Sequence, residues 1–290
     1  MTVDLGILLA VACALATNVA FLFKHRGARA AERVDPRHPL HTARALFGSR
    51  WFLAGMLVAT GAWALHVAAL ALAPLSVVQT VLAAGVALIA VMAERLFGVP
   101  VGRRQWWGLA LTACGLVLIA ATMPAPQGAH SSFTLIAMIA FEGTLFGLGG
   151  LLILGPRVGA PAHHRGVMLG AASGILFGVS DVAIKALSGL TRLHGVTGLV
   201  SPWLLMALAA SLIAFYASAR GLQIGTDPVA TIAVTSTAAN IAGITGGILV
   251  FGDPLHGDAA GLTIQAFAFI LVVAASAMTP APLHAPRAEA

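Results

Sequence analysis

Charged side chains are scarce in this chain: Asp, Glu, Lys and Arg make up 9% of its 290 residues, against roughly 25% in soluble domains. So few charges exclude an ordinary water-facing surface. The two cysteines, Cys13 and Cys114, lie inside apolar stretches, which excludes a disulfide framework or a cysteine metal knuckle. The sequence also lacks a glycine-rich phosphate loop, a His-Glu-x-x-His motif and a nucleophile elbow. We therefore expect no enzyme and no cofactor.

Hydrophobic side chains dominate instead, at 59% of the chain. They form stretches of about 18–24 residues, each long enough to cross a bilayer as a helix. Within lipid, only helices and closed barrels satisfy all of their backbone hydrogen bonds. Barrel strands are shorter than these stretches, so we predict an all-α, polytopic helical membrane protein. Its partner is the lipid bilayer, and its predicted location is the plasma membrane. We place nine transmembrane helices at 5–23, 51–72, 75–94, 105–122, 133–154, 167–189, 202–219, 228–251 and 260–278.

Basic residues are distributed asymmetrically between the loops. All of the 16 Lys and Arg residues except Lys185 and Arg192 lie at one side of the predicted spans, many of them in the loop 24–50. The positive-inside rule then places the N-terminus outside and the C-terminus in the cytosol. The net charge of +6 is explained by topology and attraction to anionic lipid, so we expect no nucleic-acid partner.

The chain also repeats itself weakly. Phe97 to Pro100 (Phe-Gly-Val-Pro) and the apolar run after it parallel Phe251 to Pro254 (Phe-Gly-Asp-Pro) and its following run. Spans 1–4 thus match spans 6–9, in opposite orientation, in a 4+1+4 arrangement that suits a site at the bilayer midplane. The alternative is that apolar helices look alike by composition. The predicted parts are a first repeat over 1–124, a linking span within 125–165, an inverted repeat over 166–280 and a disordered tail over 281–290.

Three short motifs carry a family resemblance: the run from Ala68 to Gln79 (AALALAPLSVVQ), the Phe-Gly-x-Pro turn, and Trp107-Gly-Leu at the start of the next span. With them the chain resembles the drug/metabolite transporter superfamily, and within it the EamA-like and NIPA-like bacterial members. The resemblance implies a secondary transporter, or a facilitator, of small molecules or ions. The chain departs from the common pattern at Val99 and Asp253, where members often carry Gly-Glu.

Ionisable residues at membrane depth usually face a cavity or a partner, so they are the first candidates for a site. Glu142 lies in the middle of the fifth span, where it either couples transport to a proton or cation or forms a structural hydrogen bond. The glycines after it, Gly143 and Gly147, predict close helix packing beside the acid. Asp181 and Lys185 stand one helical turn apart and are expected to pair, either structurally or by exchange with a substrate group.

Other polar residues complete the candidate set for substrate binding or coupling. His66 is expected to form an interhelical hydrogen bond or to relay protons, and Asn240 to face a substrate. Arg220 either binds an anionic group or reaches the interface. Gly170, Gly174 and Gly178 form one flat helix face for close contact. The remaining candidates are Gln79, Asn18 and Tyr216.

Three functions are compatible with this pattern. The leading hypothesis is a transporter of a small organic solute that works by alternating access, with proton or cation coupling. The second is magnesium or divalent-cation transport, as in NIPA-like proteins. Mg²⁺ prefers carboxylates, and the deep acids here are Glu142 and Asp181. The third is a membrane scaffold or sensor that transports nothing.

Overall fold

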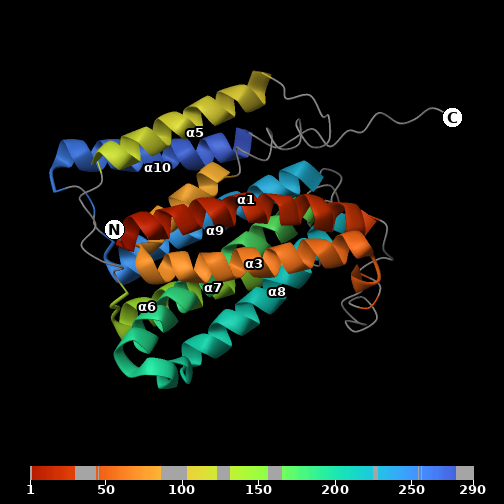
Figure 1. Cartoon of the computed structure of the whole chain (residues 1–290), viewed down its shortest axis with the longest axis horizontal. Coiled ribbons are helices and arrows are strands. Elements are labelled where there is room, and N and C mark those ends of the chain that lie inside the picture. Colours follow the sequence, from red (N-terminus) through yellow and green to blue (C-terminus); the bar gives the residue numbers. More distant parts are fainter. Residues whose placement is uncertain are drawn as a thin grey trace.

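The computed structural model describes residues 2–29, 44, 46–85, 103–122, 131–155, 165–224, 228–253, 255 and 257–278. All regular elements in these ranges are helical (Figure 1). A shorter helix, Leu75–Gly85, follows α3, and the 3-10 helix η3 (Gly195–Leu199) follows α7. The long helices are α1 (Thr2–Arg29), α3 (Arg50–Leu72), α5 (Arg103–Thr122), α6 (Leu135–Leu154), α7 (Arg165–His194), α8 (Pro202–Ile224), α9 (Pro228–Phe251) and α10 (Ala259–Met278).

These helices lie where the sequence predicts spans, and several begin at a capping residue. The Ser49 hydroxyl accepts a hydrogen bond from the backbone of Phe52 at the start of α3, and Thr134 caps α6 in the same way. Six helices in the described ranges are long and apolar enough to cross a membrane: α1, α3, α6, α7, α8 and α9. The all-helical membrane character thus agrees with the prediction, while the count of nine and the repeat remain predictions. The part of the span 75–94 beyond Gly85 lies outside the described residues.

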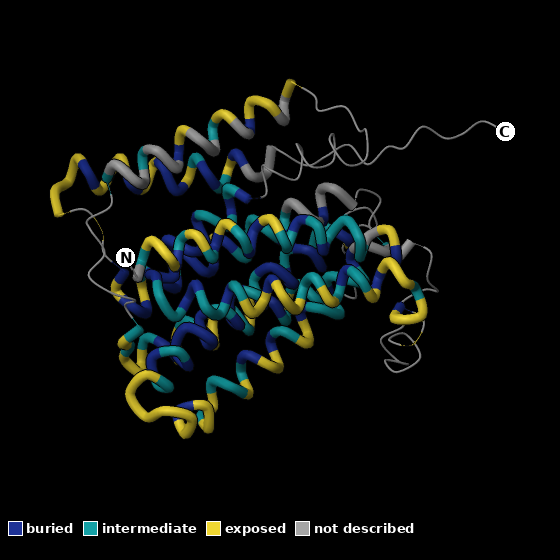
Figure 2. The backbone as a smooth tube through the Cα atoms, in the orientation of Figure 1, coloured by how far each residue is buried: buried dark blue, intermediate teal, exposed yellow. Residues whose placement is uncertain are grey.

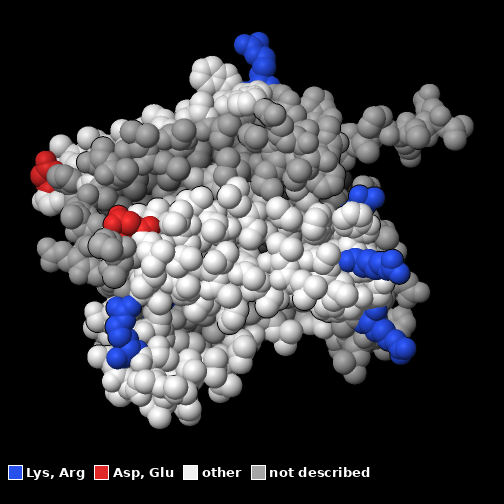
Figure 3. Space-filling view, viewed as in Figure 1, with Lys and Arg blue, Asp and Glu red and all other residues white. Residues whose placement is uncertain are grey.

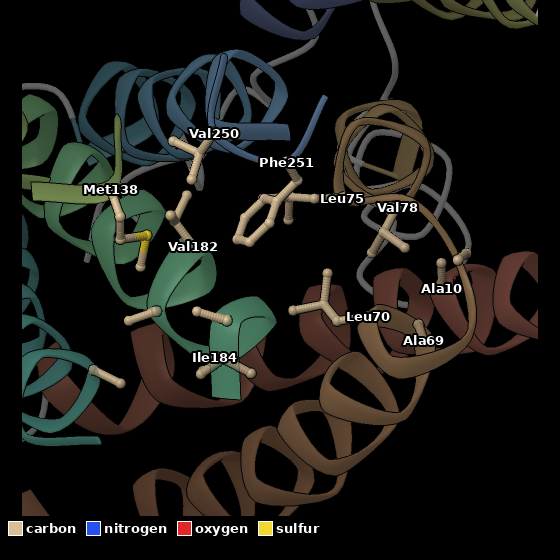
Figure 4. Close-up of a cluster of buried hydrophobic side chains, with 14 residues drawn as sticks. Ala10, Ala69, Leu70, Leu75, Val78, Met138, Val182, Ile184, Val250 and Phe251 are labelled. Atoms are coloured by element: carbon tan, nitrogen blue, oxygen red, sulfur yellow. The ribbon is translucent and has the colours of Figure 1, made fainter. Parts of the chain in front are cut away.

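Helix α7 forms the centre of the molecule. Of its membrane-length segment 67% is buried, against 17% for α6 at the periphery (Figure 2). It packs on α8, α9 and α6, while α1 packs on α3, and α5 and α10 pack on each other beside this bundle (Figure 1). Figure 4 shows the main hydrophobic cluster, in which Val182 of α7 and Phe251 of α9 meet Leu70 and Leu75.

Glycine packing follows the prediction on α7 and contradicts it on α6. A Cβ at Gly174 would overlap the carbonyl oxygen of Thr235, so the predicted glycine face of α7 lies directly against α9. Gly143 and Gly147 are exposed instead, and a Cβ at either position would meet nothing within 4 Å. The reason is helical geometry: α6 turns the face with Met138, Glu142 and Gly149 toward the bundle, and the two glycines lie off that face.

The bundle has a broad apolar surface between two charged ends. Leu57, Leu151 and Leu205 are among many large hydrophobic side chains that are exposed, and Figure 3 shows a face with charged side chains toward its ends. Leu46 and Phe52 at the start of α3 pack near Phe215 and Ala219 of α8, which brings several basic residues to one end. We call it the basic end; it holds Lys24, Arg26, Arg50, Arg165 and Arg220.

Candidate functional site

A cavity of about 260 Å³ lies between α1, α3, α7, α9 and the Leu75–Gly85 helix. Small-molecule sites are typically such hollows, mostly apolar with a few convergent polar groups. Each of the five helices contributes a polar side chain that the sequence singles out. Of the predicted candidates, the cavity brings together Asn18, His66, Gln79, Asp181 and Asn240.

Asp181 is the centre of the polar lining. Its Oδ1 lies 2.9 Å from Nε2 of His66, and its Oδ2 accepts a hydrogen bond of 2.6 Å from Nε2 of Gln79. The side chain of Asp181 retains 17% exposure and lines the cavity. The carboxylate therefore links α7 to α3 and to the Leu75–Gly85 helix, and it is still accessible to a bound solute.

The predicted pair of Asp181 with Lys185 does not form. Lys185 is fully buried, and its Nζ donates hydrogen bonds of 2.7 Å to the backbone oxygens of Leu70 and Ala73. These carbonyls end α3, where the helix dipole favours a cation. One-turn spacing on α7 permits the pair, but each side chain is bound by groups of neighbouring helices instead. Lys185 consequently fastens α7 to the end of α3 and is not part of the cavity lining as described.

Side chains hold the Leu75–Gly85 helix at its start and at Gly85, its last described residue. Nδ2 of Asn18 donates to the backbone oxygen of Gly85 at 2.6 Å, and Oδ2 of Asp253 accepts from the backbone nitrogen of Ser76 at 2.7 Å. An anion at a helix N-terminus is electrostatically favoured. The sequence analysis considers Asp253 only as part of a turn. The feature that could have indicated its role is an acidic residue directly after a long apolar span.

Lys24 is a second residue that sequence reasoning missed, because it was assigned to the basic loop. It is half-buried in α1, which continues to Arg29, and it lines the cavity. Its Nζ lies 4.7 Å from the centroid of the Phe21 ring. The signal was helical spacing, since Thr17, Phe21 and Lys24 share one face of a helix.

Besides Lys185, three predicted candidates lie away from the described cavity lining: Glu142, Tyr216 and Arg220. Glu142 of α6 is 1% exposed, and neither of its carboxylate oxygens has a hydrogen-bond partner within the ranges that the structure describes. The structural hydrogen bond considered for Glu142 is therefore not seen there. Tyr216 and Arg220 lie on α8, near the basic end.

Within the same ranges, no three His, Cys, Asp or Glu side chains are placed to hold a metal ion together. Both cysteines are free thiols, with Cys13 buried and Cys114 exposed. Cys13 lines the cavity beside His66 and Thr17. The polar groups available to a solute are thus one carboxylate, one imidazole, one ammonium, amides and hydroxyls.

Comparison with known proteins gives one relative and no family. No family model and no solved structure matches the chain. An uncharacterized protein of Corynebacterium glutamicum is 28% identical over 255 residues, which cover 86% of this chain and 85% of that protein. The chain is therefore similar to that protein over most of the length of both.

Proposed function

We propose that the protein is a secondary transporter that moves a small organic solute across the plasma membrane by alternating access. In this proposal it belongs to the drug/metabolite transporter superfamily, and its N-terminus is outside and its C-terminus cytosolic. The observation that carries the proposal is the cavity. It lies inside an apolar helix bundle and is lined by Asp181, His66, Gln79, Asn18 and Asn240, and buried polar groups in such bundles usually mark a substrate or ion path.

The packing of the helices supports two inverted repeats of four spans around a linking span. Helices α1 and α3 pack together, and so do α7 and α8, which hold the corresponding places in the second repeat. Helix α7 packs on α9, as α1 meets the Leu75–Gly85 helix through Ala14 and Asn18. The fourth spans of the two repeats, α5 and α10, pack on each other. Repeated pairing of this kind suits a site between two similar halves.

The hydrogen bonds of Asp181 join these two halves. Its partners His66 and Gln79 belong to the first repeat and Asp181 to the second. Rocking of one half against the other would stretch these bonds, and a bound solute that supplies new donors to the carboxylate would offset their loss. Differential contacts of this kind are what allow a ligand to shift a conformational equilibrium.

Proton coupling follows from the same contact. A proton on His66 neutralises the Asp181 carboxylate at 2.9 Å, and so does a cationic group of a solute. If both cannot be accommodated at once, entry of the solute releases the proton, which then leaves to the water on the side that is open. Glu142, buried without a hydrogen-bond partner in the described part of the chain, is the second candidate for carrying a proton.

Reconstitution into proteoliposomes tests the proposal. Uptake is measured for a panel of organic metabolites and Mg²⁺, with and without a pH gradient. We expect gradient-dependent accumulation of an organic solute that is lost in Asp181→Asn and retained in Arg26→Gln, which changes an exposed residue of α1. Accumulation of Mg²⁺ alone would support the second hypothesis. Absence of flux for the whole panel, with protein shown to be folded, would contradict transport.

A further inference from the structure

The cavity carries opposite charges toward its two ends. Gly55 of α3 lies against Lys24, with only 2.8 Å from an added Cβ to the Lys24 backbone nitrogen, so these residues are level in the bundle. His66, which binds Asp181, is eleven residues further along α3. At 1.5 Å per residue, the backbone of His66 is about 16 Å along α3 from the level of Gly55 and the Lys24 backbone.

The Lys24 side chain points into this space. Side chains of a helix lean toward its N-terminus, and the N-terminus of α1 lies away from the basic end, where Gly6 meets Ala73. Phe21, which holds the ammonium over its ring, is about one turn deeper in the cavity. The ammonium is therefore directed toward Asp181 and away from the basic end, which narrows the space between the two charges.

The wall between the charges is mainly apolar and aromatic, with Ala59, Ala62, Trp63 and Phe177 among its residues. The cavity has a volume of about 260 Å³, which gives room for roughly nine groups of the size of a water molecule. When His66 is neutral, a purely cationic solute would leave Lys24 without an opposite charge, and a purely anionic solute would leave Asp181 without one. Uncompensated charge is unfavourable inside an apolar bundle.

We propose that the cavity binds a small zwitterion, with its ammonium group at Asp181, its carboxylate at Lys24 and its carbon chain along the aromatic wall. The inference rests on the proposed function and deepens it by naming the substrate class. It assigns Lys24 as a specificity-determining residue.

Three probes with the same six-carbon chain test the assignment on the purified full-length protein by isothermal titration calorimetry. They are 6-aminohexanoate, which carries both charges, 6-aminohexan-1-ol, which carries the cation, and 6-hydroxyhexanoate, which carries the anion. We expect 6-aminohexanoate to bind most tightly. Lys24→Met should lower the affinity for 6-aminohexanoate about tenfold or more and leave the affinity for 6-aminohexan-1-ol unchanged. Asp181→Asn should weaken 6-aminohexanoate and leave 6-hydroxyhexanoate unchanged.

Arg26→Gln is the matched control, because it removes a cation from the same end of α1. The Arg26 guanidinium lies over the Trp51 ring at 4.1 Å from its centroid, and Arg26 is exposed. It should not change any of the three affinities. If Lys24→Met lowers the affinities for 6-aminohexanoate and 6-aminohexan-1-ol equally, Lys24 has a structural role and the inference is overturned. Absence of 6-aminohexanoate binding to the unaltered protein would overturn it as well.

Exchange of the same probes in proteoliposomes separates this inference from the proposed function. If 6-aminohexanoate binds with the expected pattern but does not cross the vesicle membrane, the site assignment stands and transport by this protein fails. If a singly charged probe is carried while 6-aminohexanoate is not bound, transport stands and the zwitterion assignment is overturned.

Discussion

Single residues in this bundle hold buried charge in two different ways. The Lys185 ammonium is stabilised by hydrogen bonds to the carbonyl oxygens that end α3, where the partial negative charge of the helix is concentrated. Asp181 is stabilised by side-chain contacts with His66 and Gln79. Because the two residues share none of these partners, each charge keeps its own environment although they stand one turn apart on α7.

This separation predicts that changes at the two residues add. Lys185→Met leaves two buried carbonyls without a donor, and Asp181→Asn exchanges a charged acceptor for a neutral one, so each should lower the free energy of unfolding by about 1–3 kcal/mol. In the double variant the effects should sum to within about 0.5 kcal/mol, as for residues without shared partners. Denaturant unfolding of the purified proteins measures this. A double variant more stable than either single one would show that Asp181 and Lys185 do pair.

Glu142 predicts opposite effects on stability and on function. A buried carboxyl group without a hydrogen-bond partner is unfavourable, by about 1–3 kcal/mol for a polar group. Glu142→Met fills a similar volume without polar atoms, so we expect a higher melting temperature together with loss of gradient-driven accumulation. Glu142→Gln should also lose accumulation yet keep part of the solute exchange, because it preserves shape and removes the acid. Normal accumulation in both variants would assign Glu142 no part in coupling.

The candidate site could be predicted in its composition but not in its contacts. Polar residues inside apolar spans are visible in the sequence, and five of them meet in one cavity. The partners of Asp181, however, are 115 residues away at His66 and 102 residues away at Gln79. Local spacing contains no information on such contacts. Helical spacing therefore predicts Lys185 as the partner of Asp181. It does not indicate Lys24 as a site residue, because Lys24 follows the last strongly apolar turn of the first span.

At the scale of elements, hydropathy predicts membrane-length segments better than helix ends. Helix α9 occupies its predicted range because a proline stands at its first position and Gly252, with a φ of 63°, follows its last residue. Helix α1 instead continues through the charged residues Lys24 and Arg26 to Arg29, since charge ends the apolar stretch without breaking a helix. This continuation is what brings Lys24 onto the cavity face.

The contact between α7 and α9 is the element-scale feature most sensitive to a small change. Gly174→Ala would place a methyl group against the backbone carbonyl of Thr235, and the backbone of α9 cannot move away easily. We therefore expect a melting temperature lower by several degrees and impaired uptake. Gly143→Ala on α6 is the control, because its Cβ would meet nothing within 4 Å. Thermal unfolding in detergent measures both. Equal tolerance at the two positions would contradict direct glycine packing of α7 on α9.

At the scale of the whole molecule, the two ends differ in charge. The basic end gathers residues from α1, α3, α7 and α8 that are far apart in sequence. At the other end, Arg192 donates to the backbone oxygen of Ala71 and Asp4 lies in the first turn of α1. A helix bundle with one strongly basic end inserts with that end toward the cytosol. The fold thus brings together, from four separate helices, basic residues that the sequence predicts to share one side.

Labelling of single cysteines tests this orientation. In a background of Cys13→Ala and Cys114→Ala, we place the new thiols at Arg103→Cys, the exposed start of α5, and at Ser132→Cys, exposed before α6. If the basic end is cytosolic, a membrane-impermeant maleimide should label Ser132→Cys in intact cells. It should reach Arg103→Cys only after permeabilisation, which serves as the control for reactivity of both thiols. Labelling of Arg103→Cys from outside would reverse the orientation. The Lys24 end of the cavity would then lie nearer the exterior than the Asp181 end.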